Sequence, residues 1–434
     1  MTTSTYALDK KGTIISIGII GMMFFVFGFV SWVNAILIPY FKIACELTNF
    51  QSYLVAFAFY ISYLVMSMPS SYLLKRVGYK KGIVIGFWIM ALGALLFVPA
   101  AYGRTYMIFL VGLFTLGTGL AVLQTVANLY ITLIGDRERA AQRISIMGIC
   151  NKGAGILAPL AFSWAVLRPT DNELFKQIPL MDVMQRTAVL DELILRVVAP
   201  YTVVAIVLFL IGVLVNYSPL PEIENPDTDD GREQKKGVLQ FPHLVLGAIA
   251  IFLHVGTQVI AIDTVINYAD SMGLSLVEAK ALPSYTLTAT IIGYLLGITL
   301  IPRFISQKRM LQICALLGLC LSVLVCVAHG QVVWFNMHLD VSLWFLVFIG
   351  LPNALIWAGI WPLAIAGLGR YAKSGSALLI MGLCGNAILP MIYGALADMI
   401  NVKQAYWVLV PCFLYIVYYA FWGHRIKSWS ARSN

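Results

Sequence analysis

The sequence predicts an all-α membrane protein with 12 transmembrane helices in two pseudosymmetric six-helix bundles. Three observations predict this fold. Of the 434 residues, 60% are hydrophobic and 11% are charged, with a mean hydropathy of +0.86, whereas soluble domains carry about 25% charged residues. Twelve apolar runs are long enough to cross a bilayer, which takes about 20 residues each. A stretch of the fifth run returns in the eleventh.

The predicted spans are apolar runs separated by charged or turn-forming residues. They lie at 14–41, 51–74, 82–101, 106–134, 143–168, 198–216, 242–269, 279–301, 310–328, 342–366, 375–398 and 405–423. The first run exceeds the length of a signal-peptide core, so we expect it to remain as a helix. Because 12 is even, both termini lie on the same side of the membrane.

The distribution of basic residues predicts which side that is. The terminal segments and the even-numbered connections hold 20 of the 29 lysines and arginines, and the odd-numbered connections hold eight. Cytoplasmic loops are enriched in these residues, so both termini should be cytoplasmic. The same rule accounts for the net charge of +9 without nucleic acid as a partner. The seven cysteines, an odd number without a CxxC pair, indicate neither a disulfide framework nor a zinc site.

Two connections are long. Residues 169–199 should form an amphipathic helix at the outer surface, because apolar residues recur at helical spacing: Leu180, Val183, Met184, Leu190, Leu193 and Ile194. Residues 219–237, which contain PEIENPDTDDGREQKK, have the composition of a flexible cytoplasmic linker. We therefore expect an N-terminal bundle at 1–216, a linker at 217–241 and a C-terminal bundle at 242–434.

The repeated stretch indicates a duplication. SIMGICNKGAGILAP at 145–159 returns as LIMGLCGNAILP at 379–390. Ile146 and Ile380 are 234 positions apart (380 − 146) and belong to the fifth span of each half. A parallel duplication predicts that offset, and transporters built from such repeats bind their substrate between the halves at the membrane midplane. A chance match of apolar letters is the alternative.

Polar side chains at membrane depth should face a cavity or another helix. Ten such residues are candidates for substrate contact: Asn34, Gln124, Asn128, Asn151, His254, Gln258, Asn353, Trp357, Trp361 and Asn386. Amides bind sugar hydroxyls and indoles cover the C–H faces of a sugar ring, so the set favours a sugar. Alternatively, single amides bond a neighbouring helix, and the indoles pack in the core or form an interfacial belt.

Lys152 lies in an apolar run, where a central charge costs about 2.5–3.5 kcal/mol. Asp263 is the only carboxylate deep in a predicted span, and it belongs to the other half. We hypothesise that the two side chains pair; the alternative is that one or both lie near a helix end and reach water. Lys152, Asp263 and Asn267 are the candidates for coupling or gating. No metal-ligand set and no catalytic set is predicted.

Six stretches resemble a known family: VNAILIPYF at 33–41, LTNFQSYLVAFAFY at 47–60, LLKRVGYKKGIVIG at 73–86, ALGALLFVPAA at 91–101, LQTVANLYITLIG at 123–135 and HVGTQ at 254–258. Together they are similar to the fucose:proton symporter family of major facilitators, in its glucose/galactose branch. The resemblance covers essentially all 12 spans. It implies the major facilitator fold and hexose import by alternating access.

The chain departs from that family at its titratable positions. Proton-coupled relatives read Asn-Asp in the first helix and carry a glutamate at the start of the helix-four motif, where the resemblance implies substrate binding and proton movement. Here Ala35 follows Asn34, and Gln124 stands at the glutamate position. The asparagine that the family uses in helix five corresponds to Asn151, so Lys152 adjoins it.

Three interpretations of coupling remain open. Asp263, together with His254, replaces the missing acids in a proton relay; sodium drives uptake, as the resemblance implies for parts of the branch; or the Lys152 ammonium occupies the coupling-cation position permanently, which leaves an uncoupled facilitator. An intramembrane enzyme using Asp263, His254 and Lys152 is a rival class, but no HExxH or GxSxG motif places these residues.

We expect a secondary active transporter that imports a hexose, such as glucose, galactose or a fucose-like sugar, across a bacterial inner membrane. The expected partners are a monosaccharide and the lipid bilayer, with no nucleic acid, and the expected oligomeric state is a monomer. The only expected cofactor is a coupling ion, either H⁺ or Na⁺. The alternatives are an uncoupled sugar facilitator and a drug or lipid exporter of the same fold.

Overall fold

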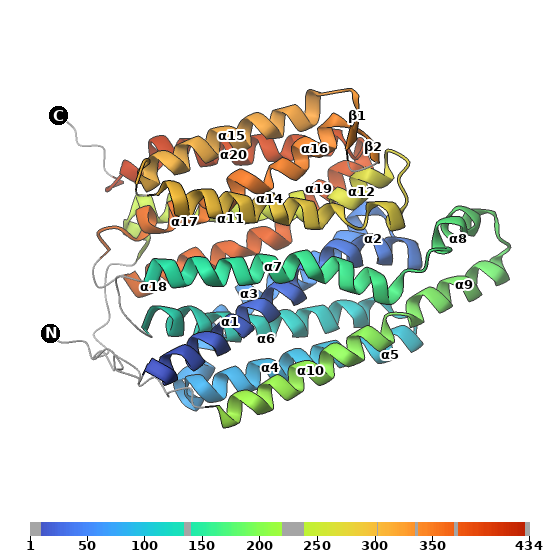
Figure 1. Ribbon diagram of the computed structural model, residues 1–434, viewed down its shortest axis with the longest axis horizontal. Coiled ribbons are helices and arrows are strands. Elements are labelled where there is room, and N and C mark those ends of the chain that lie inside the picture. The colour runs from blue at the N-terminus through green and yellow to red at the C-terminus, as the bar shows by residue number, and fades with distance from the viewer. Residues whose placement is uncertain are drawn as a thin grey trace. The chain divides into compact units, whose positions relative to one another are not determined.

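The computed structural model describes residues 10–133, 140–218, 238–301, 303–334, 337–368 and 372–429. Within these residues, 12 helical segments are long and apolar enough to cross a membrane, which confirms the predicted number (Figure 1). The sixth differs most from its prediction, because the expected surface helix and the span form one run, Val183–Tyr217. Most of the predicted linker 217–241 lies outside the described residues.

The chain divides into two compact units. Unit 1 comprises Met1–Leu47, Ala58–Pro226 and Leu276–Ser284, and unit 2 comprises Thr48–Phe57, Asp227–Ser275 and Tyr285–Asn434. Each unit therefore takes up a short segment from the other half of the chain.

In unit 1, α1 packs along α7, and α4 packs against both α6 and α10. Helix α3 begins in unit 2 and continues in unit 1 from Ala58. The helices are α1 (Lys10–Trp32), α2 (Asn34–Ala44), α3 (Asn49–Val77), α4 (Tyr79–Leu95), α5 (Phe97–Tyr102), α6 (Tyr106–Leu133), α7 (Ala140–Val166), α8 (Asp171–Gln177), η2 (Ile178–Leu180), α9 (Val183–Leu195), α10 (Val198–Tyr217) and α13 (Leu276–Ala279).

In unit 2 the same order of packing recurs: α11 packs along α19, and α15 packs against both α17 and α20. The elements are η3 (Val238–Gln240), α11 (Pro242–Asp263), α12 (Val265–Asp270), α14 (Leu282–Leu300), α15 (Gln307–Val327), β1 (Gln331–Trp334), β2 (Met337–Asp340), α16 (Val341–Phe348), α17 (Gly350–Ile365), α18 (Ala372–Met381), η5 (Gly382–Cys384), α19 (Gly385–Met399), η6 (Gln404–Val408), α20 (Leu409–Phe421) and η7 (Gly423–Arg425).

The first span of each half is interrupted at one residue, Val33 between α1 and α2 and Thr264 between α11 and α12. The two positions are 231 residues apart (264 − 33), as are Pro159 and Pro390 (390 − 159) in the fifth spans. The eleventh span has three residues fewer between its IMG motif and its proline, and there the α-helix gives way to the 3₁₀ turn η5. These shared irregularities support the duplication.

Close helix crossings set the core of each unit. A Cβ on Gly28 of α1 would stand 1.9 Å from the carbonyl oxygen of Asn151 in α7, and one on Gly385 of α19 would stand 1.9 Å from the carbonyl oxygen of Phe252 in α11. Only glycine allows backbones to approach this closely. A glycine thus permits close contact of the first and fifth spans in both units, from the first span in unit 1 and from the fifth span in unit 2.

The predicted surface helix exists, but only part of its apolar face is covered. Helix α9 packs against α2 and α5, and Tyr40 of α2 donates a hydrogen bond to the carbonyl oxygen of Leu193 at 2.5 Å. Leu190, Leu193 and Ile194 are at most 2% exposed, whereas Leu180, Val183 and Met184 are 83–85% exposed. Figure 1 shows why, because α8 and part of α9 extend past the ends of α7 and α10.

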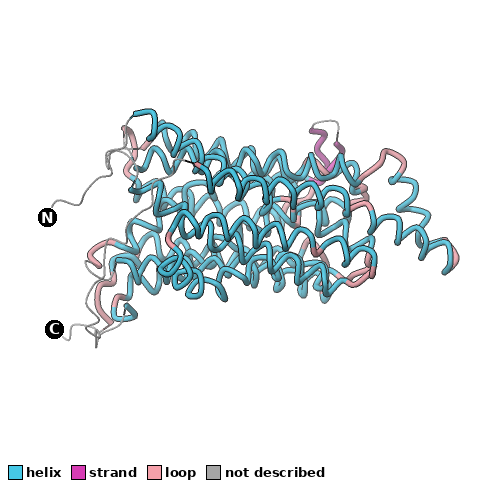
Figure 2. The backbone as a smooth tube through the Cα atoms, turned by 90° about the horizontal axis from the view of Figure 1, so that it is seen from below, coloured by secondary structure: helices cyan, strands magenta, loops and turns pink. Residues whose placement is uncertain are grey.

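A two-stranded antiparallel hairpin, not predicted from the sequence, joins α15 to α16 in unit 2 (Figure 2). Its register pairs Gln331 with Asp340 and Trp334 with Met337. Asp340 ends the hairpin and caps α16, accepting from the backbone N–H of Ser342 at 2.9 Å, and the Lys403 ammonium lies 3.7 Å away.

Candidate functional site

A buried cation–π pair lies where α1 meets α7. The Lys152 ammonium stands 4.0 Å from the centroid of the Trp32 ring, and Lys152 is 6% exposed. Trp32 Nε1 donates to Asn151 Oδ1 at 3.4 Å, and Asn151 Nδ2 donates to the carbonyl oxygen of Phe24 at 3.3 Å. A desolvated cation over an indole gains about 2 kcal/mol, which offsets much of the cost of burying the ammonium. Trp32 thus holds both predicted site residues of α7.

Each unit also contains a buried amide without a hydrogen-bond partner among the described residues. Asn34, directly after the interruption of the first span, is 0% exposed, and Asn353 in α17 is 1% exposed. In both residues the amide nitrogen and the amide oxygen are unbonded. Such a group costs about 1–3 kcal/mol when no partner is present, so a native structure keeps it for a reason. Water or a ligand hydroxyl would satisfy both atoms.

Two candidate indoles lie on one face of α17. Trp357 and Trp361 of α17 stack with ring centroids 5.3 Å apart and planes at 25°, and both are partly exposed. Gln124 in α6 and Gln258 in α11 are also partly exposed, and Asn386 in α19 is 9% exposed. Asn128 lies in α6, and its side chain falls outside what the structure describes.

The buried polar residues of α11 and α12 lie around the interruption at Thr264. His254 is 1%, Asp263 0% and Asn267 4% exposed. Asn267 Nδ2 donates to Asn49 Oδ1 at 2.9 Å and to the Tyr53 hydroxyl at 3.4 Å. Asp263 is the last residue of α11 and therefore sits at the end of a helix segment, where backbone geometry changes.

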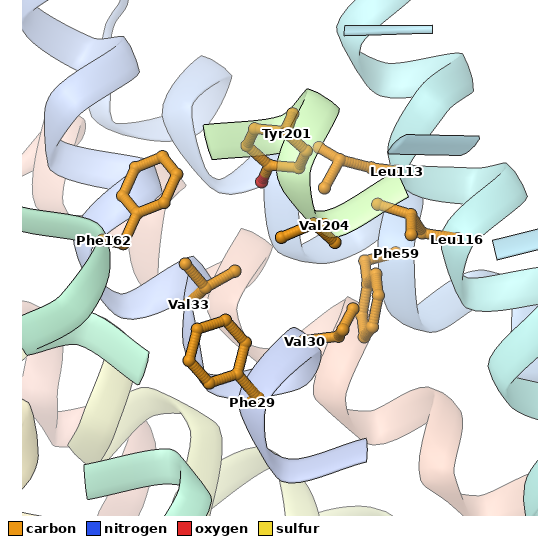
Figure 3. A pocket seen from close by; sticks show the side chains of 9 residues that line it. All are labelled: Phe29, Val30, Val33, Phe59, Leu113, Leu116, Phe162, Tyr201 and Val204. Atoms are coloured by element: carbon orange, nitrogen blue, oxygen red, sulfur yellow. The ribbon is translucent and has the colours of Figure 1, made fainter. Parts of the chain in front are cut away.

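Unit 1 contains a cavity lined by Phe29, Val30, Val33, Phe59, Leu113, Leu116, Phe162, Tyr201 and Val204 (Figure 3). It holds about 20 Å³ of free space, whereas small-molecule sites usually measure about 300–1,000 Å³. The lining is apolar apart from the Tyr201 hydroxyl, which points into the space (Figure 3). This cavity is too small and too apolar to be a hexose site.

The predicted site residues are divided between the units. Asn34, Gln124, Asn128, Asn151 and Lys152 belong to unit 1, and the other eight belong to unit 2. Trp32 contacts both Asn151 and Lys152. Trp32 was not among the predicted site residues, although an indole two residues before Asn34 was a usable signal. The proposed Lys152–Asp263 pair involves one residue from each unit and stays a prediction.

The distribution of carboxylates limits the chemistry. Among the described residues of unit 1, helices α1–α7 and α10 contain neither aspartate nor glutamate, whereas α11 and α19 of unit 2 contain Asp263 and Asp398. Asp398 lies one residue from the end of α19 and is exposed, and Asp263 is fully buried. Asp263 is therefore the buried one of these two carboxylates.

Known proteins match the chain along nearly its whole length. A family model described as Major Facilitator Superfamily matches residues 20–388. A glucose/galactose transporter of Brucella abortus is 30% identical over 407 residues, 93% of each chain. An L-fucose-proton symporter of Escherichia coli is 28% identical over 432 residues, 96% of each chain.

Solved structures agree with the fold. The crystal structure of the Major Facilitator Superfamily transporter FucP in the outward conformation is 28% identical and covers 94% of this chain and 98% of its own, with a TM-score of 0.70. A bacterial homolog of the lysosomal transporter Spinster, 16% identical, gives a TM-score of 0.65 over 95% of this chain and 96% of its own, a likeness of fold alone.

Proposed function

The chain belongs to the Major Facilitator Superfamily, and we propose that it is a secondary active transporter that imports a hexose across a bacterial inner membrane. The observation that carries the substrate class is the match to a glucose/galactose transporter over 93% of both chains. The relatives are named as transporters, and this chain is a multi-pass membrane protein rather than an enzyme. The substrate is a monosaccharide.

The polar residues of the spans support a sugar as substrate. Asn34 and Asn353 present buried amides whose nitrogen and oxygen have no partner among the described residues, and Asn151 is oriented by Trp32. Each amide offers a donor and an acceptor, as a sugar hydroxyl requires. The stacked Trp357 and Trp361 supply a flat apolar surface for a pyranose face. Gln124, Asn128, His254, Gln258 and Asn386 complete the proposed contact set.

Import is proposed to be driven by a cation. The E. coli relative is named a proton symporter, and Asp263 is the buried carboxylate available for that role in the described spans. Together with His254 it would carry the proton that the helix-one and helix-four acids carry in proton-coupled relatives. Sodium remains the second candidate ion, with carboxylate and carbonyl oxygens as its preferred ligands.

Alternating access would move two six-span halves, residues 1–216 and 242–434, about the linker 217–241. We propose that the transporter works as a monomer with both termini in the cytoplasm, in keeping with the 20 basic residues of the terminal segments and even-numbered connections.

An uncoupled facilitator is the second candidate. The Lys152 ammonium stands over Trp32, and the described helices α1–α7 and α10 of the same unit carry no carboxylate. Such a cation could replace the coupling ion. A drug or lipid exporter is less well supported, because the candidate site collects amides rather than a continuous apolar lining.

Counterflow of labelled glucose or galactose in proteoliposomes tests the substrate class without any assumption about the ion. We expect exchange of a hexose by the native chain and its loss in Gln124→Ala, with a normal purification yield. The control is Gln177→Ala, an exposed glutamine in α8. Exchange of no hexose would refute the proposal, and unchanged sugar affinity in Gln124→Ala would remove that residue from the site.

A further inference from the structure

The first two turns of α3 pack in unit 2 on Asp398, Asn267, Tyr393 and Gly394, a group of residues that we call the seat. Asp398 of α19 accepts the backbone N–H groups of Asn49 and Phe50 at 3.0 and 2.8 Å. It also accepts the side-chain amide of Asn49 at 2.6 Å. One carboxylate thus binds two of the backbone donors that the first turn of a helix leaves unsatisfied. The negative charge also suits the positive end of the helix dipole.

The seat continues along the first two turns of α3. Asn49 Oδ1 accepts a hydrogen bond from Asn267 of α12. Tyr53 is 0% exposed and packs edge-to-face on Tyr393 of α19, with centroids 5.6 Å apart. Gly394 leaves the necessary room, because a Cβ there would stand 2.5 Å from the Tyr53 ring. The start of α3 is therefore held both by hydrogen bonds and by close packing of complementary surfaces.

Water can replace the hydrogen bonds between the seat and the start of α3. Asp398 is exposed and Asn49 is partly exposed, so water can replace their mutual hydrogen bonds when they separate. A purely apolar seat would lose its burial on opening without such replacement. Bonds that are strong but replaceable suit a contact that forms and breaks repeatedly.

Helix α3 passes from one compact unit into the other just after the seat. Residues 48–57 of α3 belong to unit 2 and residues 58–77 belong to unit 1. A helix anchored in both units restrains any motion of one relative to the other. We propose that the start of α3 is a releasable latch, held by Asp398 and Asn49, which leaves its seat once in every transport cycle. This proposal rests on transport by alternating access, the proposed function.

The latch adjoins the proposed coupling residue. Asn267, which holds Asn49, follows Asp263 by four positions across the interruption at Thr264. Tyr53 lies within electrostatic reach of both Asp263 and Asp398. A change of charge at Asp263 would therefore be felt at the seat.

The eighth span, which corresponds to α3 in the duplication, also packs by its first residues in one unit. Residues 276–284, which begin the eighth span, pack in unit 1. There Ser284, 4% exposed, donates its hydroxyl to the carbonyl oxygen of Ile156 in α7 at 2.7 Å. Both second spans of the repeat are thus anchored near their starts, α3 by the Asp398 carboxylate and the eighth span by the Ser284 hydroxyl. Asp398 is accordingly the residue whose removal should free one helix and leave the other in place.

A cysteine at Ser52 reports directly on the latch. Ser52 is 1% exposed in the seated helix, so Ser52→Cys should react with a hydrophilic maleimide only when the start of α3 leaves its seat. Labelling is measured on the purified full chain in nanodiscs, where both membrane faces are reachable. The chain without the Ser52→Cys change gives the background labelling of the native cysteines. We expect Asp398→Ala to raise the labelling rate at least tenfold, and Asn49→Asp, which sets two carboxylates against each other, to do the same.

The matched control is Asp340→Ala, which also removes a helix-capping aspartate from unit 2 but does not touch α3. We expect it to leave the labelling rate within twofold of the rate in the chain that carries Ser52→Cys alone. Labelling that is unchanged by both Asp398→Ala and Asn49→Asp would overturn the latch, as would equal acceleration by Asp340→Ala, which would indicate general loosening. Since labelling needs no sugar, failure of the hexose assay and failure of the latch are distinguishable.

Discussion

Replacement of Gly28 by alanine tests the packing that positions Asn151 and Lys152. A methyl group at position 28 would stand 1.9 Å from the Asn151 carbonyl oxygen, 2.7 Å from its carbon and 2.9 Å from its Cα. All three atoms belong to the backbone, so no side-chain rotation relieves the clash. Ordinary contact begins near 3.4 Å, and α1 and α7 would have to part by about 1.5 Å.

The net effect combines two terms of opposite sign. Alanine in place of glycine stabilises a helix interior by about 0.5–1 kcal/mol. Overpacking against a backbone costs about 1–3 kcal/mol or more, so we expect Gly28→Ala to lose about 2 kcal/mol. For a unit of this size that corresponds to a fall in Tm of about 4–8 °C. Sugar affinity should fall as well, because Asn151 and Lys152 would move with α7 away from Trp32 of α1.

Thermal unfolding of the purified protein in detergent measures the effect, with Gly21→Ala as the matched control. Gly21 lies on the same helix, and a methyl group there would meet only the Met147 side chain, at 3.8 Å. We expect the control to melt at or above the native Tm. A Gly28→Ala protein as stable as Gly21→Ala, with full counterflow, would refute the proposed crossing.

Three further predictions concern charged groups. Trp32→Leu should lower the Tm by about 4 °C, because about 1–2 kcal/mol of cation–π energy is lost. The fall in Tm should be smaller in a Lys152→Met background. Equal falls in both backgrounds would show that the ring does not stabilise the ammonium. Asp263→Asn should keep hexose counterflow within about twofold and abolish accumulation driven by an ion gradient, and accumulation at the native rate would exclude Asp263 from coupling. Burial would raise the pKa of Asp340, but hydrogen bonds from Ser342 and Gly330 and the Lys403 ammonium hold that pKa below its usual value. A lowered pKa stabilises the folded state above the unfolded pKa of about 3.9 and no longer does so once the pH falls through the folded value. Asp340→Asn should therefore lower the Tm by about 3 °C at pH 7 and by less as the pH approaches 3, and a difference independent of pH would contradict this account.

The spans and their order were predictable because a bilayer imposes one requirement on every crossing helix, a run of about 20 apolar residues. The duplication was predictable because the fifth and eleventh spans share the IMG motif, a cysteine and a proline, although three residues fewer separate the motif from the proline in the eleventh. The hairpin Gln331–Asp340 was not, since its strands are four residues long and lie outside the hydrophobic runs. No turn motif marks it in the sequence.

Residue types in the candidate site were predictable, but their partners were not. Polar residues in apolar runs stand out in the sequence, as Asn34 and Lys152 do. The Trp32 ring that accepts the Lys152 ammonium is 120 positions away (152 − 32), and Asp398 is 349 positions from the Asn49 that it caps. Such pairs depend on helix crossings that periodicity does not determine. The extent to which the apolar face of α9 is covered could not be predicted for the same reason, because spacing shows which residues share a face and not how far the face is covered.

Uptake of labelled hexose into proteoliposomes, with proton and sodium gradients imposed separately, tests most directly whether this chain is a cation-coupled sugar importer. We predict that one of the two gradients drives glucose or galactose to an internal concentration above the external one. Equilibration to equal concentrations under both gradients would contradict coupling and identify a facilitator. The absence of any hexose entry would contradict the sugar-transport proposal itself.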